Sequence, residues 1–150
     1  MKVHWLALLI IVGLALAIPT VSAKIVEEKN GYIVTTIDNA SRFVEISSLS
    51  SYTLTQGQTR WHSSTVPSGA TTFISDLNWG KPSNSLSLTV YSPDLSILGP
   101  YYDAADGVVD GRVYLMISRS TGLASGTWSS KVYGNSITGT QTYSYSASGY

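Results

Sequence analysis

The chain has 150 residues, no cysteine and a formal net charge of zero, and charged residues make up only 12% of it. Without cysteine there are no disulfides, thiolate metal sites or cysteine nucleophiles, and without excess positive charge nucleic acid is not an expected partner. The length allows one domain with a hydrophobic core. Ten Tyr and four Trp favour strands over helices.

Residues 1–23 have the pattern of a signal peptide. Lys2 provides a positive start, and an apolar run of about 14 residues extends to Pro19. That run is shorter than the roughly 20 residues that a membrane-spanning helix needs. Val21-Ser22-Ala23 fits a cleavage site of small residues, so we expect an exported chain that begins at Lys24 and does not insert in a membrane after cleavage. The alternative is a retained N-terminal anchor.

Residues 24–51 are expected to form N-terminal strands and a linker. The polar residues 24–30 predict a flexible lead-in, whereas residues 32–37 and 42–46 predict short strands. The Ser-rich residues at the end of this segment mark a boundary. The main domain is therefore placed at residues 52–150.

Short strands separated by Gly and Pro turns fill the main domain. Alternation is clearest in residues 127–133, where Trp128, Ser130 and Val132 share one face, and Trp128 is expected to anchor the core. Strands are predicted at residues 52–55, 59–66, 71–79, 85–91, 96–98, 112–118, 127–133 and 140–146. About eight strands at this spacing predict an all-β sandwich, with no helix after the signal peptide.

Six short motifs follow one another in this region. They are Gly57-Gln58-Thr59-Arg60-Trp61, Val66-Pro67-Ser68-Gly69, Asn84-Ser85-Leu86-Ser87-Leu88, Tyr91-Ser92-Pro93-Asp94, Gly126-Thr127-Trp128 and Val132-Tyr133-Gly134. In this order they resemble the motifs of the bacterial and archaeal pre-peptidase C-terminal domain. The resemblance implies a jelly-roll-like β-sandwich and a non-catalytic module, usually appended to secreted proteases and often thought to bind substrate or a surface. Similar domains in clostridial collagenases bind collagen and calcium.

Three carboxylates lie close together in one glycine-containing loop, at Asp103, Asp106 and Asp110. Their oxygens could gather around Ca²⁺, although the spacing is not that of an EF-hand. The alternative is a pair of Asp-Gly turns that join two strands. A catalytic pair of carboxylates would also need a cleft and a raised pKa.

Three tryptophans of the main domain, Trp61, Trp79 and Trp128, are either sugar-stacking or core residues. Trp128 is assigned to the core because it is in phase with Val132. Trp79 lies at a strand end beside a glycine and is expected to be exposed. Together with Tyr101 and Tyr102, next to the acidic loop, it is predicted to form a ligand-binding rim; otherwise these residues cap the edge of the sandwich.

His62 is the one histidine of the predicted mature chain. A serine hydrolase needs such a base beside its nucleophile, usually with a carboxylate partner, and the Gly-x-Ser-x-Gly motif is absent. We therefore assign no catalytic residue. A His62 within hydrogen-bond reach of a serine and a carboxylate would favour an enzyme.

These features predict a secreted, non-enzymatic binding or structural module that acts at the cell surface or outside the cell, with an extracellular protein or polysaccharide as partner. The first alternative is a carbohydrate- or protein-binding adhesin subunit that assembles with other chains. The second is a small secreted hydrolase. An exposed aromatic platform would favour sugar binding, and an unpaired edge strand would favour assembly.

Overall fold

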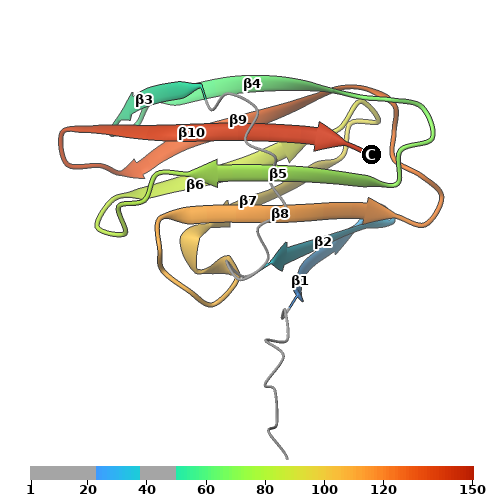
Figure 1. Ribbon diagram of the computed structural model, residues 1–150, viewed down its shortest axis with the longest axis horizontal. Helices are drawn as coiled ribbons and strands as arrows, with labels where there is room; N and C mark the ends of the chain where they lie inside the picture. The colour runs from blue at the N-terminus through green and yellow to red at the C-terminus, as the bar shows by residue number, and fades with distance from the viewer. Residues whose placement is uncertain (1–22, 38–49) are drawn as a thin grey trace, which may run out of the picture.

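The structure is a computed structural model that describes residues 23–37 and 50–150 (Figure 1). These residues form ten strands and one 3-10 turn, Asp103–Ala105. The strands are β1 (Ala23–Lys29), β2 (Tyr32–Ile37), β3 (Ser51–Thr55), β4 (Thr59–Val66), β5 (Thr72–Asn78), β6 (Ser85–Tyr91), β7 (Ile97–Tyr102), β8 (Arg112–Arg119), β9 (Gly126–Ser136) and β10 (Thr140–Gly149). Residues 1–22 of the predicted signal peptide and the strand expected at residues 42–46 lie outside the described residues.

The strands form two antiparallel sheets that pack face to face. The six-stranded sheet has the order β1-β2-β8-β5-β10-β3, and the four-stranded sheet has the order β4-β9-β6-β7. In Figure 1, β10, β5 and β8 cross in front of β9, β6 and β7. The all-β sandwich predicted from the strand spacing is therefore confirmed, and the eight strands β3 to β10 agree with the number expected for the main domain.

The N-terminal hairpin belongs to the six-stranded sheet, which corrects the expectation of a flexible lead-in at residues 24–30. Residues 24–29 belong instead to β1, which pairs with β2. β2 in turn pairs with β8, and Tyr32 and Val34 are buried in the common core. The hairpin thus shares the hydrophobic core of the sandwich through Tyr32 and Val34. Within residues 23–37 and 50–150, no helix is long and apolar enough to cross a membrane.

The core lies between the sheets and is centred on Trp128. The indole stacks on Phe73 of β5, with ring centroids 4.7 Å apart, and meets the edge of Tyr32 of β2 at 5.6 Å. Its Nε1 donates a hydrogen bond to the Ala124 carbonyl oxygen at 2.8 Å. Trp128 is fully buried, as its phase with Ser130 and Val132 predicted. Such a ring joins strands of both sheets and contributes much of the buried apolar area.

Candidate functional site

The outer face of the four-stranded sheet carries several aromatic side chains. Because neighbouring residues of a strand point to opposite faces, residues that flank the core positions of β4, β9, β6 and β7 turn outward. We call this surface the outer face. It consists of Thr59, Trp61, Ser63 and Thr65 of β4, Thr127, Ser129, Lys131 and Tyr133 of β9, Ser87, Thr89 and Tyr91 of β6, and Ile97 and Tyr102 of β7.

Trp61 and Tyr91 form a pair of aromatic rings that pack against each other on the outer face. Trp61 pairs with Lys131, and Tyr91 pairs with Ser129, so the two rings come from strands on either side of β9. The ring centroids are 5.2 Å apart and the planes are inclined by 51°. Trp61 is 55% exposed. The two rings therefore meet across β9, with Trp61 open to solvent and Tyr91 partly buried beside it.

The surface of β6 beside these rings is polar but closely packed. Ser87 and Thr89 lie on the outer face, yet both are buried beneath their neighbours. Tyr133 and Tyr102 flank Ser87 in the same cross-strand row. Hydroxyl groups with aromatic rings around them make a surface that can both stack and hydrogen-bond.

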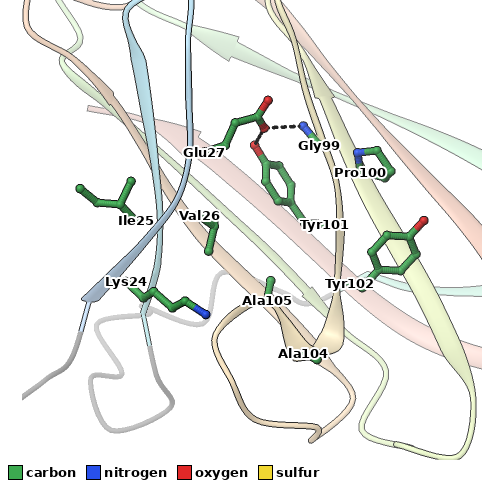
Figure 2. A pocket seen from close by; sticks show the side chains of 10 residues that line it. All are labelled: Lys24, Ile25, Val26, Glu27, Gly99, Pro100, Tyr101, Tyr102, Ala104 and Ala105. Carbon is green, nitrogen blue, oxygen red and sulfur yellow. Dashed lines mark hydrogen bonds between the residues drawn. The ribbon is translucent and has the colours of Figure 1, made fainter.

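A groove lies at one flank of the sandwich, between the edge strands β1 and β7 (Figure 2). Its volume is about 650 Å³, and it is lined by Lys24, Ile25, Val26, Glu27, Gly99, Pro100, Tyr101, Tyr102, Ala104 and Ala105. Glu27 Oε2 accepts hydrogen bonds from the Gly99 backbone N–H at 2.9 Å and from the Tyr101 hydroxyl. Burial and the Glu27 carboxylate raise the pKa of Tyr101 well above its usual range. This carboxylate thus links the two sheets at the flank.

The binding rim predicted from Trp79, Tyr101 and Tyr102 is not assembled on the surface. Trp79 is only 5% exposed, and its Nε1 donates to the Asn84 carbonyl oxygen at 3.0 Å. Tyr101 is also buried, because its ring points inward from β7. Tyr102 alone is open, at 47% exposed. The expected exposure of Trp79 was wrong because the chain after β5 turns back over the core.

The acidic loop is organised by one carboxylate. Asp103 is buried and accepts backbone hydrogen bonds from Asp110, Gly111 and Arg112, at 3.0–3.1 Å. Asp106 Oδ1 accepts from the Val108 N–H at 2.9 Å. Gly107 and Gly111 both have positive φ, at 97° and 83°. These features are those of two Asp-Gly turns.

The three carboxylates are nevertheless close enough to influence one another. Burial and the neighbouring Asp103 and Asp106 carboxylates raise the pKa of Asp110. In the described part of the chain, no group of three His, Cys, Asp or Glu side chains is arranged to hold a metal ion. Calcium binding at Asp103, Asp106 and Asp110 therefore stays a prediction.

His62 lies in an aromatic cluster at the opposite flank, between β4 and β10. Its ring stacks on Tyr145 at 4.5 Å and meets the edge of Tyr52 at 4.6 Å. Nε2 is 2.9 Å from the Tyr143 hydroxyl oxygen. Burial, followed by the positive charge of Arg60, lowers the pKa of His62 to about 4. Among the described residues, hydrogen bonds connect His62 to neither a serine nor a carboxylate.

Sequence reasoning did not single out Trp61 as the exposed aromatic, although the strand pattern contained the signal. Val66 marks the inward phase of β4, and Trp61 lies five positions earlier, which places it on the other face. Tyr91 lies next to the inward Val90 and follows the same rule. The pairing of the two rings across β9 needs the sheet order, which is not local information.

The fold is an antiparallel β-sandwich, and one of its sheets carries aromatic side chains on its outer face. No family model matches the chain. The chain is 46% identical over 55 residues to an uncharacterized protein of Archaeoglobus fulgidus, a match that covers 37% of this chain and 75% of that protein. The chain belongs to the same family as this archaeal protein.

Proposed function

We propose that the protein is a secreted, non-catalytic module that binds a target at the cell surface or outside the cell. The observation that supports this function is the exposed Trp61 ring packed against the partly exposed Tyr91 on the outer face. Contiguous exposed apolar patches mark interaction sites in soluble proteins. Export is inferred from residues 1–23, and secreted material is therefore expected to begin at Lys24.

The jelly roll that the pre-peptidase resemblance implies is part of this proposal. In a jelly roll, eight strands form two packed sheets in two Greek keys. The order β3-β10-β5-β8 in one sheet and β4-β9-β6-β7 in the other fits that arrangement. β1 and β2 would then be an additional hairpin at the β8 edge. Jelly rolls are common in non-catalytic binding proteins, which favours the same class of function.

Cosedimentation tests the binding function. The mature protein is mixed with insoluble cell-envelope and extracellular material of its host, and the bound fraction is measured for the wild type, Trp61→Ala and Tyr150→Ala. Tyr150 is an exposed aromatic outside the outer face, so it is a matched control. We expect Trp61→Ala alone to lose binding. Absence of binding by the folded wild type, or equal loss in both variants, would reject the function.

The groove at the flank supports a second candidate, an adhesin subunit that assembles with other chains. β1 and β7 are edge strands of the described sheets, and Ile25 beside the groove is 55% exposed. Edge strands with exposed apolar residues can pair with another chain. Sedimentation velocity over a range of concentrations should then show association that Ile25→Glu abolishes. A monomer at every concentration would exclude self-assembly at this flank.

A further inference from the structure

We propose that the outer face binds an acidic polysaccharide, with Trp61 and Tyr91 stacking on a sugar ring and Lys131 pairing with a carboxylate or sulfate group of the polymer. This inference rests on the proposed binding function and names its ligand class. It follows from the placement of one positive charge beside a pair of aromatic rings, on a surface without carboxylates.

The charge of the outer face is the first part of the argument. Of its thirteen residues, Lys131 is the one with a formal charge, and the remainder are Ser, Thr, Tyr, Trp and one Ile. The two ion pairs found among the described residues join Arg112 to Asp76 and Arg119 to Asp94, and neither involves Lys131. A polymer with regularly spaced negative groups complements such a cation, whereas a cationic partner would meet repulsion.

The position of Lys131 relative to the rings is the second part. Lys131 lies between Trp61 and Thr89 in one cross-strand row, and Ser129 lies between Ser63 and Tyr91 in the next. Strands lie about 4.8 Å apart, so β4 and β6 are separated by about 10 Å. The stacking rings and the cation therefore lie within the span of one or two sugar units.

The chemistry of the ligand is the third part. The C–H face of a pyranose is apolar and packs on aromatic rings, while its hydroxyl groups need hydrogen-bond partners. Tyr133 and Tyr102 add two further aromatic rings to the outer face. The Ser and Thr side chains around the rings can donate and accept hydrogen bonds. An open sheet face suits a long polymer better than a small ligand, which prefers a concave pocket.

The test measures the affinity of the mature protein for polygalacturonate, alginate and dextran sulfate, with neutral dextran as the uncharged comparison. Titrations at about 0.01 M and 1 M salt exploit the fall of the Debye length from about 30 Å to 3 Å. The wild type is expected to bind at least one acidic polymer more tightly than dextran, and more weakly at high salt. Lys131→Gln should weaken acidic-polymer binding about two- to fivefold at low salt, the range of one exposed ion pair. Trp61→Ala should weaken it about tenfold or more, as for an aromatic anchor of an interface.

Lys81→Gln is the matched control, because Lys81 is exposed in the loop between β5 and β6. It should leave the affinity unchanged. Equal effects of Lys81→Gln and Lys131→Gln, equal binding of dextran, or no binding of any acidic polymer would overturn the inference. Binding to host envelope material that depends on Trp61 would in those cases preserve the proposed function and reject only the ligand class.

Discussion

The inner and outer faces of the four-stranded sheet each carry a tryptophan, one buried in the core and one exposed to solvent. Trp128 of β9 and Trp61 of β4 lie on paired strands, three residues apart along the β4 register, because Trp128 pairs with Ser64. Trp128 is fully buried between Phe73 and Tyr32, whereas Trp61 is 55% exposed beside Tyr91. The position of a residue in the two-residue period of its strand thus decides whether an indole stabilises the fold or remains available to a ligand.

Replacing each tryptophan by alanine should separate these purposes, and this comparison has the largest expected effect. Trp128→Ala should lower the free energy of unfolding by roughly 3–5 kcal/mol, because it leaves a cavity between the sheets. A domain of this size has about 5–15 kcal/mol in total, so the variant should be close to unfolding. Trp61→Ala should cost less than about 1 kcal/mol. Urea unfolding monitored by circular dichroism measures both, and a cost below about 1 kcal/mol for Trp128→Ala would contradict the comparison.

The carboxylates of the acidic loop allow the same comparison between an inward and an outward group. Asp103 points inward and accepts backbone hydrogen bonds, while Asp106 is partly exposed and can be replaced without breaking them. If Ca²⁺ binds here at about 100-fold excess over its dissociation constant, folding should gain roughly 2.7 kcal/mol. Thermal unfolding of the wild type and Asp106→Asn, with Ca²⁺ and with chelator, measures this gain. Coincident midpoints in all four conditions would leave two ordinary Asp-Gly turns.

His62 is half-buried at the flank of the sandwich, so it is intermediate between a core residue and a surface residue. The pH dependence of stability should reveal this partial burial. The pKa of His62 is about 4 in the folded protein, below its usual value of 6.5, so the unfolded chain binds the proton more readily. The stability that neutral His62 provides is therefore complete above pH 6.5 and is lost as the pH falls from 6.5 to 4. After allowance for solvent screening, we expect a loss of about 1 kcal/mol.

His62→Phe provides the control for that titration. Phenylalanine keeps the ring contacts with Tyr145 and Tyr52 but removes the proton-binding site, so the difference in stability between the two proteins should change only between pH 6.5 and 4. The ionisation of Asp94 does not change between pH 6.5 and 4. Burial raises its pKa, but hydrogen bonds from Ser92, Tyr32 and Ser96 outweigh burial and hold the pKa at about 2. A difference that is constant with pH would mean that His62 is fully solvated in the folded protein.

Local sequence determined the strands and their inward faces. The predicted bounds of the strands at residues 32–37, 59–66 and 85–91 agree with β2, β4 and β6, because alternation between Gly and Pro turns is encoded within each segment. The burial of Trp128 follows from the same alternation. These features need no knowledge of which strands become neighbours.

Only the tertiary structure decided which side chains meet across long separations in sequence. Trp79 is buried at a strand end, where its carbonyl oxygen accepts from Gln141, 62 residues away. Residues 24–29 are polar enough for a lead-in, yet they form a strand because β2 provides backbone partners and Glu27 binds Tyr101, 74 residues away. The Trp61–Tyr91 pair likewise needs β9 between β4 and β6. Side-chain alternation is a property of a single strand, whereas the neighbour of each strand is set by the packing of the whole sandwich.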